Sequence, residues 1–220
     1  MGLLDRIPSR KSDSDPPGNL PVQSPSPAAP IFATKALKKF LTGLTTRQSP
    51  VLLDLGPVVG SNIALLGEQL GCKIFVEDIF ADLDRHVREA KLDAFPAFLS
   101  TRFPQADGSV DGVLCWDLID YLDRAAAQAL AGQLTRLLRP NGALLGFFGT
   151  ARVRETRYTK YIIVDEMNLK HHPYPAARGP QPILLNRDII RLFSGLRVSD
   201  SFLLKNNLRE ILFRKSVATT

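Results

Sequence analysis

The segment VLLDLGPVVGSN, residues 51–62, has the residue spacing most typical of ligand-binding chemistry in this chain. The short apolar run VLLDLG, residues 51–56, is typical of a strand buried on both faces of a parallel sheet, and it ends in Asp54, Leu55 and Gly56. Gly60 follows Gly56, and glycines at these places let the backbone turn sharply and let a ligand approach it closely. Because ligands of doubly wound sheets bind beyond the carboxyl ends of the strands, the segment predicts a binding site at this turn.

Two further acids, Glu77 and Asp78, close the next apolar run, about 17 residues after Gly60. A carboxylate at that place can accept hydrogen bonds from both hydroxyls of a ribose, so the pair predicts a ligand that contains a nucleoside. Other nucleotide sites are excluded, because the sequence has no Gly-x-Gly-x-x-Gly, no Gly-Lys-Ser/Thr and no Tyr-x-x-x-Lys. It also lacks the Gly-x-Ser-x-Gly of a serine hydrolase.

Candidates for acid–base chemistry are fewer. Trp116 and Asp117 close another apolar run, where a strand delivers residues into the same cleft, and Asp117 could orient a substrate or accept a proton. His171 and His172 are further candidates, although a histidine pair beside a proline is more typical of a surface loop than of a catalytic dyad. No Cys/His cluster has the spacing of a metal site, so no metal is predicted.

These residues must be positioned by the elements of residues 51–148, where apolar runs alternate with helical periodicity. Such alternation favours a parallel sheet with helices on both faces. A further, weaker strand is predicted over 94–99. The other predicted strands cover 51–56, 73–77, 111–117 and 143–148, and the predicted helices cover 61–70, 80–92 and 123–138.

The two ends of the chain differ from this middle. Residues 1–30 are rich in Pro and Ser and have little apolar surface to bury, which predicts a disordered tail. Residues 31–44 have the periodicity of an amphipathic helix. The segment 151–182 is interpreted as irregular. Beyond it, the pattern predicts a helix over 186–195 and an antiparallel hairpin of strands 197–205 and 209–215.

In their order along the chain, these motifs resemble those of the class I S-adenosylmethionine-dependent methyltransferases. The family's first motif, Asp/Glu-x-Gly-x-Gly-x-Gly, corresponds to Asp54, Gly56, Val58 and Gly60, with valine in place of the middle glycine. The piece LTRLLRPNGALLGFF, residues 134–148, is similar to the family's helix, Pro-x-Gly turn and fifth strand.

The resemblance implies a Rossmann-like, seven-stranded, mostly parallel sheet with helices on both faces and a C-terminal antiparallel hairpin. It implies a single domain over residues 31–220, with 151–182 as an insertion on the substrate side. The sequence differs from the family near Leu99, where many members carry an acid that contacts the adenine. The implied cofactor is S-adenosylmethionine, and the residues carried over to bind it are Asp54, Gly56, Gly60, Glu77, Asp78 and Asp117.

Charge is distributed unevenly along the chain. Residues 51–150 carry a net charge of −5 and residues 151–220 one of +7. The basic residues of that last third are interleaved with tyrosines, a mixture that suits an anionic partner. Two functions are therefore open: a methyltransferase with an unidentified methyl acceptor, and a non-catalytic protein of the same fold that binds RNA or another protein through its basic C-terminal third. No recognised nucleic-acid-binding module is visible.

Composition restricts the cellular setting. No apolar stretch approaches the roughly 20 residues that span a bilayer, and the N-terminus lacks the apolar region of a secretory signal. Two isolated cysteines, Cys72 and Cys115, cannot form a disulfide framework. These features predict a cytoplasmic protein without a membrane segment, and they do not indicate its oligomeric state.

Overall fold

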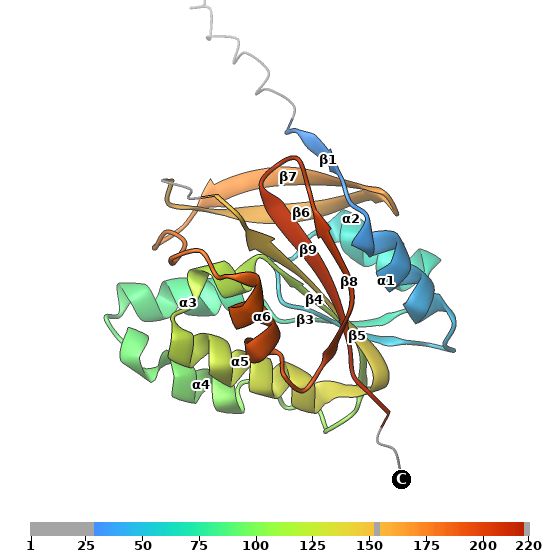
Figure 1. The fold of residues 1–220 in the computed structure, drawn as a ribbon, viewed down its shortest axis with the longest axis horizontal. Helices are drawn as coiled ribbons and strands as arrows, with labels where there is room; N and C mark the ends of the chain where they lie inside the picture. The colour runs from blue at the N-terminus through green and yellow to red at the C-terminus, as the bar shows by residue number, and fades with distance from the viewer. Residues whose placement is uncertain (1–28, 152–154, 218–220) are drawn as a thin grey trace, which may run out of the picture.

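A computed structural model describes residues 29–151 and 155–217. Its centre is a six-stranded sheet with the strand order β3-β2-β4-β5-β9-β8 (Figure 1). The first four of these strands are parallel, and β9 is antiparallel to both β5 and β8, so the predicted parallel sheet and C-terminal hairpin are confirmed. The strands are β2 (Val51–Asp54), β3 (Lys73–Val76), β4 (Val110–Trp116), β5 (Leu138–Gly149), β8 (Arg197–Leu203) and β9 (Leu208–Arg214).

Helices cover both faces of the sheet (Figure 1). One face carries α1 (Ala36–Thr45) and α2 (Gly60–Ile63), which continues as a π-helix over Ala64–Gln69. The other face carries the remaining four helices, α3 (Ile79–Arg88), α4 (Phe95–Thr101), α5 (Arg124–Leu137) and α6 (Asn186–Leu192). Each face has its own buried hydrophobic cluster, so the sheet lies between two cores.

Consecutive residues of β2 point to opposite faces of the sheet and pack in different cores. Leu52 packs in the cluster beneath α1 and Leu53 in the cluster beneath α3 to α6, and both are fully buried. Burial of such a side chain stabilises the fold by about 1.5–3 kcal/mol. Gly112 in β4 lets α1 lie directly on the sheet, because a Cβ there would lie 2.7 Å from Leu44 and 2.9 Å from Phe40.

The prediction of a seventh strand over 94–99 is wrong. These residues form the end of a 3₁₀ turn, Leu92–Ala94, and most of α4. Phe95 and Leu99 lie four residues apart and are both fully buried, which is helical spacing, and Pro96 suits the first turn of a helix. The sheet therefore has six strands, and β3 is one of its edges.

The interpretation of 151–182 as irregular is also wrong for much of the segment. β6 (Arg157–Asp165) and β7 (Asn168–Pro175) form an antiparallel hairpin, and the short strand β1 (Ile31–Ala33), expected to be helical, adds to its edge. Figure 1 shows this second sheet across one end of the central one. The sequence of β6 has no strict alternation: Tyr158, Tyr161 and Ile163 are the buried residues, and residues 161–164 are all apolar. The period of two that indicates a strand is therefore missing from the sequence.

The C-terminal hairpin also fixes the first helix. Glu210 of β9 is fully buried and accepts hydrogen bonds from the backbone amides of Lys35 (2.8 Å) and Ala36 (2.9 Å), which begin α1. The predicted tail, residues 1–30, lies outside the described residues except for its last two. Across the described ranges, every helix is too short or too polar to cross a bilayer.

Candidate functional site

Asp54, at the end of β2, is the centre of the predicted ligand turn. Its carboxylate is 5% exposed and accepts hydrogen bonds from the Gly56 amide (3.0 Å) and from Nε1 of Trp116 (2.6 Å). Burial raises the pKa of Asp54 to about 6, although the two hydrogen bonds lower it. The turn therefore contains a carboxylate that changes charge just below neutral pH.

Trp116 lies against this turn. A Cβ added to Gly56 would lie only 2.8 Å from Cδ1 of Trp116, so the absence of a side chain at Gly56 makes room for the indole. Trp116 itself has a φ of 51°, a left-handed conformation that is rare for a bulky residue. Its ring stacks on Tyr161 of β6, with centroids 5.1 Å apart and the planes within 4°. Strain of this kind is characteristic of functional positions.

A buried amide, Asn62, holds β6 over the same turn. Its side chain donates to the carbonyl of Tyr161 (2.8 Å) and accepts from the amide of Ile163 (2.8 Å). These are the backbone groups of β6 to which a neighbouring strand would otherwise hydrogen-bond. Asn62 is 2% exposed and belongs to α2, directly after Gly60 and Ser61. The sequence analysis missed this residue, since an asparagine at the start of a helix normally indicates only a cap.

Glu77 and Asp78, the predicted ribose ligands, have partners within the protein. Both Glu77 oxygens accept hydrogen bonds, from Nη1 of Arg102 (2.6 Å) and from Nε2 of Gln105 (2.9 Å). Asp78 caps α3 by accepting from the Ala81 amide (3.1 Å), and burial raises its pKa. Arg102 and Gln105 follow α4, the helix that replaces the predicted seventh strand.

Asp117, the next predicted residue, is paired with an acid that the sequence analysis missed. Asp117 is 6% exposed, and its Oδ1 has no hydrogen-bond partner among the described residues. Asp120, one turn later in the 3₁₀ helix Leu118–Tyr121, accepts from the Gly149 amide (2.6 Å). Burial raises both pKa values to about 7, and for Asp117 the charge of Asp120 adds to the shift, whereas a hydrogen bond from Tyr161 lowers it.

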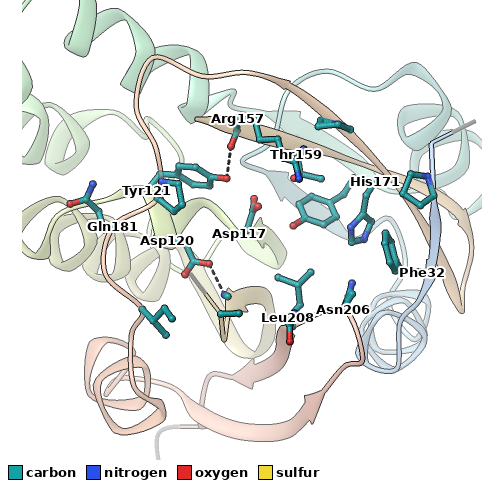
Figure 2. Close-up of a pocket in the computed structure, with 18 of the residues that line it drawn as sticks. Phe32, Asp117, Asp120, Tyr121, Arg157, Thr159, His171, Gln181, Asn206 and Leu208 are labelled. Carbon is teal, nitrogen blue, oxygen red and sulfur yellow. Dashed lines mark hydrogen bonds between the residues drawn. The ribbon is translucent and has the colours of Figure 1, made fainter. Parts of the chain in front are cut away.

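These two acids lie at a cavity of about 1110 Å³. Figure 2 shows Asp117 near its centre, with Asp120 and Tyr121 on one side and His171 and Phe32 on the other. Its walls come from the second sheet and from loops around residues 180–183 and 206–208. The two acids form the floor of the cavity. The loop at 181 is attached to this floor, since the Gln181 amide donates to the carbonyl of Asp120 (2.6 Å).

The two candidate histidines are separated by the strand that contains them. Both belong to β7, so the expectation of a surface loop is wrong. His171 lines the cavity and packs against Phe32 (4.4 Å between ring centroids) and Tyr161 (4.8 Å), whereas His172 is exposed. Burial lowers the pKa of His171 to about 4, which keeps the ring neutral at physiological pH.

The structure thus brings the sequence-predicted residues together in two places. Asp54 and Gly56 meet Trp116 at the turn, and Asp117 and His171 share the cavity. Gly60 and the two acids that follow β3, Glu77 and Asp78, do not line that cavity. Within the described ranges, no group of three side chains comes together that could hold a metal ion.

Comparison with known proteins identifies the central part of this fold. The profile of the methyltransferase domain family matches residues 53–146, which run from β2 to β5 and include the turn, Trp116 and both cavity acids. No curated protein sequence matches the chain.

Solved structures share the fold at low sequence identity. The PH0226 protein from Pyrococcus horikoshii OT3 is 15% identical, with 82% of this chain and 88% of that chain covered and a TM-score of 0.51. The cyclase SpnF is 12% identical, with 83% and 80% covered and a TM-score of 0.50. A SAM-dependent methyltransferase from Aquifex aeolicus is 14% identical, with 81% and 88% covered and a TM-score of 0.49. The first two of these structures show the common fold, and identities this low show nothing of the substrate.

Proposed function

Because residues 53–146 match the methyltransferase domain family, we propose that this protein is a class I enzyme that transfers a methyl group from S-adenosylmethionine to an acceptor bound in the cavity at Asp117. One observation of the structure supports the place proposed for the acceptor. Trp116 and Asp117 are consecutive residues, and the first contacts the Asp54 turn while the second lines the cavity. The turn proposed for the cofactor and the cavity proposed for the acceptor are therefore connected through the end of one strand, and a direct transfer requires the two sites to be neighbours.

The residues at the turn fit the cofactor in type. Asp54, Gly56 and Gly60 would face its methionine part, and Glu77 or Asp78 its ribose. In the structure Oδ1 of Asp54 accepts from Trp116 and Glu77 accepts from Arg102, so a ligand at these carboxylates competes with these two donors. Space is available at Gly60, where a Cβ would meet no atom within 4 Å.

The cofactor supplies a methyl group on a positively charged sulfur. The task of the protein is then to align the acceptor, to exclude water and to accept a proton where the acceptor carries one. Asp117 is the residue we assign to the proton, since a base with a pKa of about 7 is well matched to neutral pH. Tyr161, which stacks on Trp116 and lines the same cavity, lowers the pKa of Asp117 and is the residue we assign to orient its carboxylate.

The test is titration of the full chain with S-adenosylmethionine and, separately, with S-adenosylhomocysteine. Calorimetry should give micromolar dissociation constants, about −8 kcal/mol of binding free energy. Trp116 is the only tryptophan of the chain, so its emission should change when the indole leaves Asp54. Gly60→Arg, which enters open space, should fold and lose binding.

A folded wild-type protein that binds neither ligand at millimolar concentration would overturn the proposal. That result would direct attention to the non-catalytic alternative, in which the basic C-terminal third binds RNA or another protein. The matched methyltransferase family favours the enzyme over that alternative. One basic side chain of this third is used within the fold, since Lys215 donates to the carbonyls of Thr135 (2.8 Å) and Leu138 (2.7 Å).

A further inference from the structure

The floor of the cavity carries two acids, and the structure describes no cation paired with either of them. We infer that the methyl acceptor is a cationic amine whose ammonium group binds between Asp117 and Asp120, beneath the aromatic side chains of the cavity wall. This inference rests on the proposed methyl transfer for the fate of the amine, but the binding of the amine can be measured without it.

The first argument is the state of the two carboxylates. Asp117 is more than nine-tenths buried, it lines the cavity, and its Oδ1 has no partner among the described residues. Asp120 uses Oδ2 to accept from the Gly149 amide. A buried carboxylate oxygen without a hydrogen-bond donor is costly, and a group of opposite charge offsets that cost. A bound ammonium would donate hydrogen bonds to both acids at once.

The second argument is that the basic residues of the wall do not supply this charge. Arg157 pairs with Glu155, and its side chain is 48% exposed. His171 is half-buried between Phe32 and Tyr161 and is neutral at physiological pH because burial lowers its pKa to about 4. Among the described lining residues, the acids therefore determine the sign of the charge that the floor attracts.

The third argument is the composition of the wall above the acids. Phe32, Tyr121 and Tyr161 all line the cavity. An ammonium group is attracted to the face of an aromatic ring, and carboxylates combined with aromatic side chains are a typical environment for organic cations. A cavity of about 1110 Å³ has room for an amine that carries a further organic group.

Methyl transfer to the amine needs only Asp117 as the proton acceptor and the cofactor as the methyl donor. The amine binds as an ammonium ion, and one N–H bond breaks as a new O–H bond forms on Asp117. The nitrogen keeps the electron pair, which then forms the bond to the methyl carbon as the sulfur–carbon bond breaks. The electron pair of that broken bond stays on sulfur, which becomes a neutral thioether.

The experiment uses three probes of similar size: 2-phenylethylamine as the cation, 2-phenylethanol as the neutral analogue and phenylacetate as the anion. Calorimetry on the full chain without cofactor, at pH 8, should show the amine binding at least tenfold more tightly than the alcohol, and phenylacetate more weakly still. Asp117→Asn should weaken amine binding at least tenfold. Asp107→Asn is the matched control, because it makes the same substitution at a side chain that is 78% exposed and does not line the cavity.

A second measurement stays informative if Asp117→Asn does not fold. Amine affinity of the wild type should fall at least tenfold between pH 8 and pH 5, as protons compete for Asp117 and Asp120. The other titratable groups at the cavity do not change charge over this range: His171 of β7 is neutral, and Tyr121 and Tyr161 have pKa values raised by burial. Arg157 of β6 is the remaining charged side chain among the described residues that line the cavity.

The inference is overturned if the alcohol or phenylacetate binds as well as the amine, if Asp117→Asn and Asp107→Asn bind it equally, or if no amine binding is seen at about 10 mM. The two proposals fail separately. Amine binding without any binding of S-adenosylmethionine would contradict the proposed function and keep the amine site. Cofactor binding without amine binding would do the reverse.

Discussion

Nε1 of Trp116 donates a hydrogen bond of 2.6 Å to Oδ1 of Asp54, and this bond joins the end of β4 to the end of β2. The same oxygen accepts from the Gly56 amide, so one carboxylate organises the turn and holds the indole against it. Because Trp116 precedes Asp117, movement of the indole would affect both the turn and the cavity. The relationship leads to the first prediction.

Trp116→Phe should bind S-adenosylhomocysteine about tenfold more tightly than the wild type. Phenylalanine retains an aromatic ring but has no donor for Asp54, and a hydrogen bond to a charged group contributes about 1.5–3 kcal/mol that a ligand must otherwise displace. Calorimetric titration measures the difference. Tyr158→Phe serves as the control, since it removes a hydroxyl bonded to Asp84, away from the turn. Weaker binding by Trp116→Phe would show that the indole contacts the ligand instead of competing with it.

The two glycines of the turn should respond differently to alanine. At Gly56 the new Cβ would lie 2.8–2.9 Å from the buried indole, so overpacking should reduce the free energy of unfolding by about 1–3 kcal/mol. At Gly60 nothing lies within 4 Å, and Gly60→Ala should leave stability unchanged within about 0.5 kcal/mol. Urea unfolding, followed by far-UV circular dichroism, compares the two variants. Equal losses would mean that the indole is not held against Gly56 in solution.

Asn62→Ala should destabilise the protein by about 2–6 kcal/mol. The substitution leaves a buried carbonyl at Tyr161 and a buried amide at Ile163 without partners, and each unsatisfied group costs about 1–3 kcal/mol. Ser61→Ala, at the neighbouring exposed position of α2, is the matched control in the same denaturation series. A loss no larger than that of the control would mean that β6 is not anchored to α2.

Stability should fall as the pH rises from about 4 to about 7. Asp117 and Asp120 have pKa values near 7 in the folded protein, well above the usual 3.8, so over this range the folded state binds protons that the unfolded chain has already released. The free energy of unfolding should therefore be greater at pH 5 than at pH 8. In Asp117→Asn that difference should be smaller by about 1–3 kcal/mol.

Urea unfolding at the two pH values provides the measurement, with Asp107→Asn as the exposed control. Adding a saturating cationic amine should restore stability at pH 8 if the amine site is correct, since a ligand that binds only the folded state stabilises it. A protein that is equally stable at pH 5 and pH 8 would contradict the assignment of the two buried acids.

Much of this architecture could be predicted from local patterns. The strand that ends at Asp54, the turn glycines Gly56 and Gly60 and the alternation through residue 148 depend on interactions close in the sequence, and the parallel sheet follows from them. The delivery of Trp116 and Asp117 to the carboxyl edge follows for the same reason, because β4 is parallel to β2.

Other features depended on residues distant in the chain. The segment 94–99 is ambiguous by itself, and its helix is decided by the burial of Phe95 and Leu99 against the core. The β6–β7 hairpin is fixed to α2 by Asn62, about 100 residues away in the sequence. Periodicity cannot detect such a contact, since it reports only which face of an element is apolar.

The type of each site residue was determined by the sequence alone, whereas its partner was decided by the tertiary structure. Asp54 was recognisable as a turn acid, but its bond to Trp116 joins residues 62 positions apart. Asp117 was a candidate from its place after a strand, but only the fold places it with Asp120 at the floor of a cavity beneath β6 and β7. Ionisation and ligand preference depend on burial and on neighbouring charge, and both are properties of the folded chain.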